Sequence, residues 1–182
     1  VTQCQMSGNL KFDISVSEQV QQKKTMLAKL LPQHRKRWLV ASTHQGDEGL
    51  ALAAFTIIKK QFPQLLLIIV PRHPERFETV AKLCINQGYA VVKRSEQIQV
   101  TEQDVWLLDT LGELMPAYAL ADLVTMGGSF SHIGGHNPLE PALFNKAIIA
   151  GNDMSNFSEI LTQLKQNQAI VQLAPATKTH YS

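Results

Sequence analysis

Short, wholly apolar runs alternate with longer amphipathic segments along almost the whole chain. Residues 65–70 are all apolar, which is typical of a parallel strand buried on both faces of a sheet. Residues 47–60 instead carry apolar side chains at helical spacing, among them Leu50, Ala54 and Ile57. A strand and a helix of this kind, joined by short connections, are the parts of a βαβ unit.

The same alternation predicts the other elements. We expect further strands at residues 38–42, 89–92, 105–108, 123–126 and 147–150, and the last predicted helix precedes the apolar pair Ile170-Val171. We expect helices from Ser17 to Pro32, from Pro74 to Gly88, at 114–120 with an interruption at Pro116, at 138–144 and at 155–166. The chain is therefore predicted to be an α/β protein, a Rossmann-like doubly wound parallel sheet of about six strands.

Length and composition point to one domain. A chain of 182 residues with 45% hydrophobic content can bury a single core. We place that domain at residues 17–174, after a linker at 1–16 and before a frayed tail at 175–182.

Charge, cysteine content and hydropathy exclude several classes of protein. The net charge is only +2 and the basic residues form no block, so we expect no nucleic-acid partner. Cys4 and Cys84 are far apart and have no metal-type spacing, which predicts plain thiols. No apolar run reaches the roughly 20 residues that span a bilayer, so we expect the chain as given to be soluble.

Ligands of such sheets bind at the carboxyl ends of the strands. Four loops that follow predicted strands have unusual sequences, at residues 42–46, 71–76, 109–114 and 127–140. Neither the glycine fingerprint of dinucleotide-binding folds nor a Walker sequence is present, so the usual NAD and P-loop chemistries are not expected.

Residues 127–141 combine two glycine pairs with the start of a helix. Gly134 and Gly135 permit a tight turn, but the density of glycines favours close approach of the backbone to a ligand. Unpaired N–H groups at a helix start suit an anion. Asn137 and Glu140 match a capping pair, which would only stabilise the helix; alternatively, the Glu140 carboxylate accepts hydrogen bonds from a ribose diol.

The 71–76 loop contains two arginines, for which we expect different roles. Arg72 follows an apolar strand and lies between prolines, where its guanidinium can be aimed at a phosphate or carboxylate. Arg76 is expected to be a solvated surface charge. His44 and His73 are each an anion donor or a loop hydrogen-bonder, and these alternatives stay open.

His132 and His136 are four residues apart, which superficially suggests metal ligands. The glycines between them interrupt the helix on which such a pair would share a face, so we expect no metal site there.

Taken together, these motifs resemble a known family over nearly the whole chain. They are Gly8-Asn9-Leu10-Lys11-Phe12-Asp13, Ala41-Ser42-Thr43-His44, Pro71-Arg72-His73-Pro74-Glu75-Arg76-Phe77, Asp109-Thr110-Leu111-Gly112-Glu113-Leu114, Gly127-Gly128-Ser129, Gly134-Gly135-His136-Asn137-Pro138-Leu139-Glu140-Pro141-Ala142 and Asn156-Phe157. Their order and spacing resemble the C-terminal half of bacterial 3-deoxy-D-manno-octulosonic acid (Kdo) transferases.

The resemblance implies the donor-binding half of an inverting GT-B glycosyltransferase. Such an enzyme transfers Kdo from CMP-Kdo to the lipid A precursor in lipopolysaccharide biosynthesis, at the cytoplasmic face of the inner membrane of a Gram-negative bacterium. The family's general base, most acceptor contacts and the membrane contact belong to an N-terminal domain. We therefore expect no catalytic residue in this chain, which we interpret as a fragment inactive by itself.

The resemblance also implies roles for individual residues. Arg72, with His73 beside it, would pair with the phosphate or sugar carboxylate of the donor, and the loop Leu111-Gly112-Glu113-Leu114 would contact the cytosine through main-chain groups. Gly128, Ser129, Gly134 and Gly135 would line the phosphate and sugar, while Asn137 and Glu140 would complete the nucleotide site. We expect no cofactor and no metal. Two departures from the family pattern, at Gln45 and at Gly151-Asn152-Asp153, put contacts from those positions in doubt.

Overall fold

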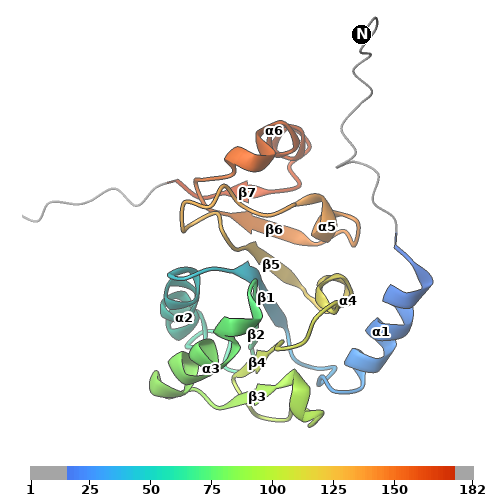
Figure 1. The fold of residues 1–182 in the computed structure, drawn as a ribbon, viewed down its shortest axis with the longest axis vertical. Coiled ribbons are helices and arrows are strands. Elements are labelled where there is room, and N and C mark those ends of the chain that lie inside the picture. The colour runs from blue at the N-terminus through green and yellow to red at the C-terminus, as the bar shows by residue number, and fades with distance from the viewer. Residues whose placement is uncertain (1–15, 175–182) are drawn as a thin grey trace, which may run out of the picture.

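The computed structural model describes residues 16–174, so the predicted linker, except for residue 16, and the predicted tail lie outside the described residues. A seven-stranded, all-parallel sheet has the order β3-β4-β2-β1-β5-β6-β7 (Figure 1). The strands are β1 (Arg37–Thr43), β2 (Leu66–Pro71), β3 (Val91–Lys93), β4 (Val105–Leu107), β5 (Leu123–Met126), β6 (Ala147–Ala150) and β7 (Val171–Gln172). The predicted fold class is confirmed, and the short edge strand β7 brings the count to seven.

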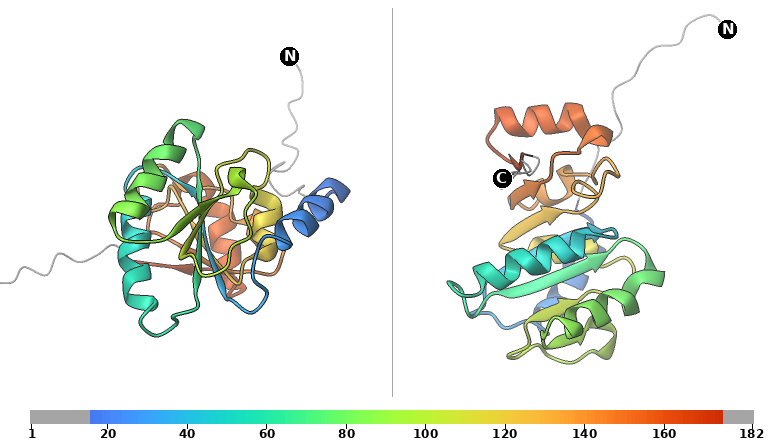
Figure 2. Two further views of the ribbon diagram at one scale, coloured as in Figure 1. Left: turned by 90° about the horizontal axis from the view of Figure 1, so that it is seen from below. Right: turned by 90° about the vertical axis from the view of Figure 1, so that its left-hand side faces the viewer.

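Helices cover both faces of the sheet. They are α1 (Glu18–Ala28), α2 (Asp47–Ile58), α3 (Phe77–Asn86), α4 (Leu114–Leu120), α5 (Leu139–Ala142) and α6 (Ser158–Gln166), with short 3₁₀ turns η2 (Pro74–Arg76), η3 (Arg94–Glu96) and η4 (Ser155–Phe157). Figure 2 shows α2 and α3 on one side of the sheet and α1 and α4 on the other. None of the helices within residues 16–174 combines the length and apolar character needed to cross a membrane.

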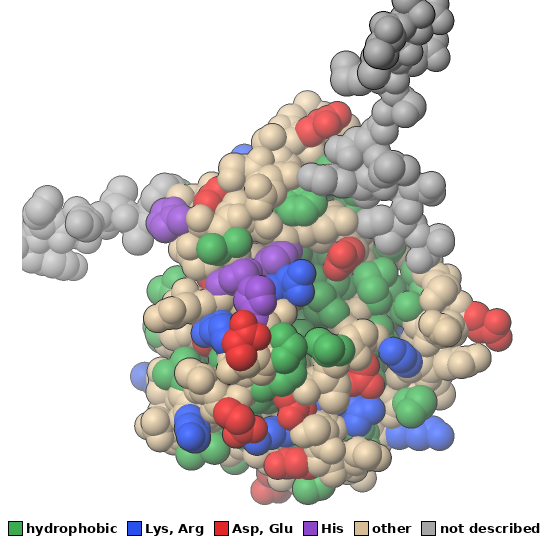
Figure 3. Space-filling model, in the orientation of Figure 1, with side chains coloured by type: hydrophobic (Ala, Val, Ile, Leu, Met, Phe, Trp, Pro, Cys, Tyr) green, Lys and Arg blue, Asp and Glu red, His purple; other side chains and the backbone are tan. Residues whose placement is uncertain are grey.

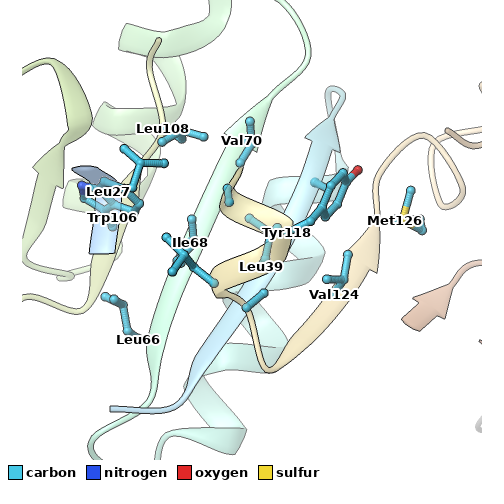
Figure 4. Close-up of a cluster of buried hydrophobic side chains, with 14 of the residues drawn as sticks. Leu27, Leu39, Leu66, Ile68, Val70, Trp106, Leu108, Tyr118, Val124 and Met126 are labelled. Carbon is cyan, nitrogen blue, oxygen red and sulfur yellow. The ribbon is translucent and has the colours of Figure 1, made fainter. Parts of the chain in front are cut away.

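Alternate residues of the central strands feed two separate cores, because successive side chains of a strand point to opposite faces. Leu39 and Ala41 of β1 belong to the core beneath α1 and α4, part of which is drawn in Figure 4 with the buried Tyr118 among its members. Trp38 and Val40 belong to the core beneath α2 and α3. The sheet is thus buried on both faces at its centre, as its apolar sequence predicts.

Two helices differ in detail from the sequence prediction. In α2 the buried side chains include Leu52 and Phe55, whereas Leu50 is 57% and Ile57 66% exposed, so part of the periodic set marks the outer side of this helix. In α4, Pro116 does not interrupt the helix. It lies in the first turn, where a backbone N–H has no intrahelical partner to lose.

Candidate functional site

Strands β1 and β5 are neighbours in the sheet. From β1 the chain adds β2, β3 and β4 on one side, and it then crosses to the other side to add β5, β6 and β7. This is the switch point at which open α/β sheets bind ligands. The loop after β1 and the loop after β5 meet there: His44 Nε2 lies 2.9 Å from His136 Nε2, and the two rings are nearly parallel. His73, from the loop after β2, meets the His44 ring edge-on with centroids 5.3 Å apart. Figure 3 shows histidine and cationic side chains gathered on one face of the molecule.

Arg72 stands beside this histidine cluster with its guanidinium exposed. Its backbone N–H donates to the Thr43 carbonyl, which anchors the loop after β2 to the end of β1. No hydrogen bond or ion pair holds the guanidinium within residues 16–174. Its charge nevertheless lowers the pKa of both His136 and Glu140. An unpaired cation close to several polar groups is suited to an anionic ligand.

The surroundings of the two paired histidines favour their neutral forms. Burial, followed by the neighbouring His44, Arg72 and His73, lowers the pKa of His136 to about 4. Burial also lowers the pKa of His44, opposed by Asp47 and assisted by the nearby cationic side chains. The sequence left open whether His44 binds an anion or only holds its loop, and it did not place His136 among the candidate ligand-binding residues. Both histidines lie in loops that follow strands at the same edge of the sheet, which was the one signal in the sequence that they could meet.

Glu140 lies at the start of α5, close to a fully buried phenol. Burial raises its pKa, while the Tyr118 hydroxyl and Arg72 act in the opposite direction. Burial, then the Glu140 carboxylate, raise the pKa of Tyr118 well above its usual value. The Tyr118 hydroxyl is nevertheless left without a well-formed hydrogen bond within the described residues. The Glu140 carboxylate and the Tyr118 hydroxyl thus lie near Arg72, and the described residues do not fill all of their hydrogen-bonding positions.

The predicted capping pair does not form as expected, because the N-cap residue of α5 is Pro138 and not Asn137. Asn137 Oδ1 accepts a hydrogen bond from the Leu139 N–H at 3.1 Å. No backbone N–H at this helix start donates to Glu140 within residues 16–174. Because α5 has only four residues, the helix dipole invoked for the anion site is small.

The glycines of the 127–135 segment are packed closely against other residues of this chain. A Cβ on Gly134 would lie 2.4 Å from Asn156 Nδ2, and one on Gly135 would lie 2.2 Å from Met154 Sδ. Gly128, Gly134 and Gly135 all have positive φ. From the sequence, the density of glycines favoured close approach of the backbone to a ligand. In the structure, packing against the protein's own residues is sufficient to require glycine at these positions.

The N–H groups of these three glycines also have partners. Gly128 donates to Asp47 Oδ2 at 2.8 Å, Gly134 to Asp153 Oδ2 at 3.0 Å, and Gly135 to the Gly128 carbonyl. Asp47 Oδ2 accepts the His44 N–H as well, and so ties the loop after β1 to the loop after β5. These glycines shape the loop, and their predicted contact with a donor stays a prediction.

The hydroxyl of Ser129 is used inside the protein. It donates to the Met126 carbonyl at 2.5 Å and accepts from the Gly151 N–H at 2.7 Å, and the residue is fully buried. The Ser129 carbonyl accepts from the Asp153 N–H as well, so the predicted contact of Ser129 with a donor stays a prediction.

The 111–114 loop is exposed at Leu111 and Gly112, while the side chain of Glu113 is engaged within the protein. The buried Glu113 carboxylate accepts from Arg94 Nη2 at 3.0 Å and from the Thr110 hydroxyl. Leu111 is 73% exposed, and Leu114 begins α4, the helix that carries Tyr118 to Glu140. The Gly112 carbonyl accepts from Lys23 Nζ at 2.9 Å, and the contact of this loop with cytosine stays a prediction.

Arg76 is not the solvated surface charge that the sequence predicts. Its Nη1 and Nη2 lie 2.6 and 3.0 Å from the two oxygens of Glu48, whose side chain is 1% exposed. Thr43 Oγ1 donates to the same carboxylate. Arg76 thus neutralises a buried acid beneath the site.

Between residues 16 and 174, no group of three or more His, Cys, Asp or Glu side chains is arranged to hold a metal ion. Cys84 is a free, buried thiol, and Cys4 lies outside the described residues.

No family model matches the sequence. Among solved structures, the chain is similar to the C-terminal CMP-Kdo binding domain of WaaA from Acinetobacter baumannii, with a TM-score of 0.78 and 32% sequence identity over 85% of this chain and 81% of that one. This chain belongs to the Kdo transferase family. The resemblance drawn from the loop motifs is thereby confirmed.

Curated Kdo transferases agree with that assignment. The 3-deoxy-D-manno-octulosonic acid transferase of Haemophilus influenzae is 37% identical over 169 residues, which cover 92% of this chain and 40% of the relative. The probable mitochondrial Kdo transferase of Arabidopsis thaliana is 30% identical over 182 residues, again 40% of its length. This chain therefore spans about two fifths of the Kdo transferases that it matches.

Proposed function

We propose that this chain is the donor-binding domain of a Kdo transferase and binds CMP-Kdo at the carboxyl ends of β1, β2, β4 and β5. The observation that carries the proposal is the exposed Arg72 guanidinium, without a hydrogen-bond or ion-pair partner in the described part of the chain and close to Glu140. The CMP-Kdo binding named for the Acinetobacter baumannii domain supports the choice of ligand.

In this proposal each loop has one task. Arg72 pairs with the phosphate or sugar carboxylate and supports the departing CMP, as cationic donors do for a leaving phosphate. The 111–114 loop contacts the cytosine through its backbone, and Glu140 contacts the ribose hydroxyls. Gly128, Ser129, Gly134 and Gly135 line the sugar and phosphate.

The complete enzyme would transfer Kdo to the lipid A precursor with inversion, at the cytoplasmic face of the bacterial inner membrane. The general base, the acceptor contacts and the membrane contact would come from outside this chain. We further propose that donor binding needs no metal, because Glu48 and Glu113 are committed to Arg76 and Arg94. A GT-B enzyme for another nucleotide sugar and a non-catalytic nucleotide-binding module are the rival functions.

Calorimetric titration of the 182-residue chain with CMP, UMP, GMP and NAD tests the proposal. CMP is expected to bind tightest, and UMP about 10- to 100-fold more weakly, because a base with reversed hydrogen-bonding groups leaves partners unsatisfied at about 1–3 kcal/mol. Equal affinity for CMP and UMP, or preference for NAD, would refute the assignment. Loss of CMP binding in EDTA, restored by magnesium, would refute metal independence.

A further inference from the structure

Two imidazoles in direct contact form an unusual feature beside the proposed phosphate and carboxylate site. The distance of 2.9 Å between the Nε2 atoms of His44 and His136 requires one proton between them, donated by one ring and accepted by the other. The outward Nδ1 atoms of both rings have no hydrogen-bond partner within residues 16–174. With both rings neutral, one Nδ1 carries a proton and the other is bare.

We propose that the His44–His136 pair takes up one proton from solvent when an oxyanion binds at Arg72. The added proton occupies the bare Nδ1, so both rings then point an N–H outward while they share the proton between their Nε2 atoms. This inference rests on the proposed function, since the oxyanion is the phosphate or the carboxylate of the donor sugar nucleotide. It assigns His44 and His136 a part in ligand binding that Arg72 alone does not perform.

Burial, together with the charges around the pair, explains why the added proton is disfavoured without a ligand. Asp47, at the start of α2, favours the charged form of His44, whereas His73, Arg76 and Arg72 disfavour it. His136 faces Arg72, His73 and His44, each of which disfavours its protonation. Glu140 lies close enough to Arg72 for their charges to interact. Burial is therefore the first cost of another proton on the pair, and the positive charge of Arg72, which no carboxylate pairs with in the described residues, adds to that cost.

A bound oxyanion reverses this balance. It offsets the positive charge of Arg72 and attracts a positive imidazolium directly, so both effects raise the pKa of the pair. By linkage, uptake of one proton makes the affinity for the oxyanion fall as pH rises, by up to about tenfold per pH unit. This dependence applies between the pKa of the empty pair, about 4 for His136, and the higher pKa of the occupied pair.

Nitrogen-15 NMR of the imidazole rings, followed from pH 4 to 8 in the full chain, measures the effect directly. The probes are cytidine, the methyl phosphodiester of CMP, and free Kdo. Cytidine lacks the oxyanion, and the phosphodiester has no second ionisation of its own, unlike CMP, whose second pKa lies near 6. The phosphodiester and Kdo distinguish phosphate from carboxylate as the source of the oxyanion.

We expect saturation with the phosphodiester or with Kdo to raise the titration midpoint of the pair by at least about one pH unit, and cytidine to leave it unchanged. Calorimetry in buffers of different ionisation enthalpy measures the protons taken up when the phosphodiester or Kdo binds. His136→Gln and His44→Gln should abolish this uptake. His34 is an exposed histidine before β1, at the other end of the strands, so His34→Gln should retain the uptake.

If the phosphodiester or Kdo binds and neither moves the midpoint, the inference is overturned while the proposed function stands. If no cytidine nucleotide binds, the proposed function fails and the inference fails with it.

Discussion

Arg72 and Arg76 are four residues apart but have different physical roles. Arg72 extends an exposed guanidinium that no hydrogen bond or ion pair holds in the described part of the chain. Arg76 makes two hydrogen bonds to Glu48, whose side chain is almost completely buried. Of these two arginines, Arg76 has a structural role and Arg72 is left available for the proposed ligand, so substitution can separate the two.

Arg72→Ala is expected to weaken CMP binding by about 10- to 100-fold, since a hydrogen bond to a charged group contributes about 1.5–3 kcal/mol. Its melting temperature should stay close to that of the wild type, because the lost side chain is exposed. Arg76→Ala is the matched control and should lower the free energy of unfolding by about 3–5 kcal/mol, because it leaves Glu48 buried and uncompensated. Calorimetric titration and urea unfolding give both values. Equal effects of the two substitutions on unfolding would contradict this division.

Glu140→Gln is expected to change stability and binding in opposite directions. The raised pKa means that the folded state favours the protonated carboxyl. Its contribution to stability is therefore complete below its unfolded pKa of about 4.3 and is lost as pH rises through the folded value. At pH 7 the variant should melt above the wild type, with the advantage vanishing near pH 3.5, while CMP affinity falls. A lower melting temperature of the variant at pH 7 would contradict the prediction.

The contact between β1 and β5 determines the shape of the site. Gly127, directly after β5, donates its N–H to the Ala41 carbonyl, and a Cβ there would lie 2.4 Å from the Ser42 carbonyl oxygen. Ser42 itself has a positive φ of 51°, at a register shift of β1. The two strand ends therefore approach each other through backbone alone, which places His44 against His136.

Gly127→Ala and Gly49→Ala should change stability with opposite signs. The first forces backbone atoms apart and is expected to cost about 1–3 kcal/mol or more, as overpacking does. The second lies in α2 with no atom within 4 Å of the added methyl group, so it should stabilise by about 0.4–1 kcal/mol through helix propensity and a less flexible unfolded chain. Urea unfolding provides the comparison. A Gly127→Ala protein as stable as the wild type would show that the strand ends are not closely packed.

At the scale of the whole molecule, the strand order gathers residues from distant parts of the sequence at one edge. His44 and His136 are 92 residues apart and meet because β1 and β5 pair in parallel. Folding therefore creates a cluster of neutral histidines that the unfolded chain lacks, and this cluster links the stability of the domain to pH.

The free energy of unfolding is expected to fall as pH drops from about 6.5 towards 4. The pKa values of His44 and His136 are lowered in the folded protein, so their stabilising contribution is present above the unfolded pKa of about 6.5 and is lost as protons bind preferentially to the unfolded chain. Urea unfolding at pH 7, 6 and 5 measures the decline. His136→Gln should flatten it, and His34→Gln should leave it unchanged; an unchanged decline in His136→Gln would exclude the pair as its cause.

Much of the fold was predictable because its signals are local. The apolar run at residues 65–70 and the proline and glycine positions between elements predict the alternation of strands and helices. The amphipathic spacing was a weaker guide to orientation. In α2 the periodic residues Leu50 and Ile57 lie on the exposed side, because which side of a helix is buried depends on where the helix lies over the sheet.

The sequence by itself determined the α/β class, the loops at the carboxyl ends of the strands, and the family to which these loops belong. Only the tertiary structure decided which atoms in those loops remain available. It bound Arg76 to Glu48, committed the Ser129 hydroxyl and the glycine N–H groups to the protein, freed Glu140 from helix capping, and joined His44 to His136. The physical reason is that hydrogen bonds, burial and charge act between atoms close in space. Those distances follow from strand pairing between remote segments, which local sequence patterns do not encode.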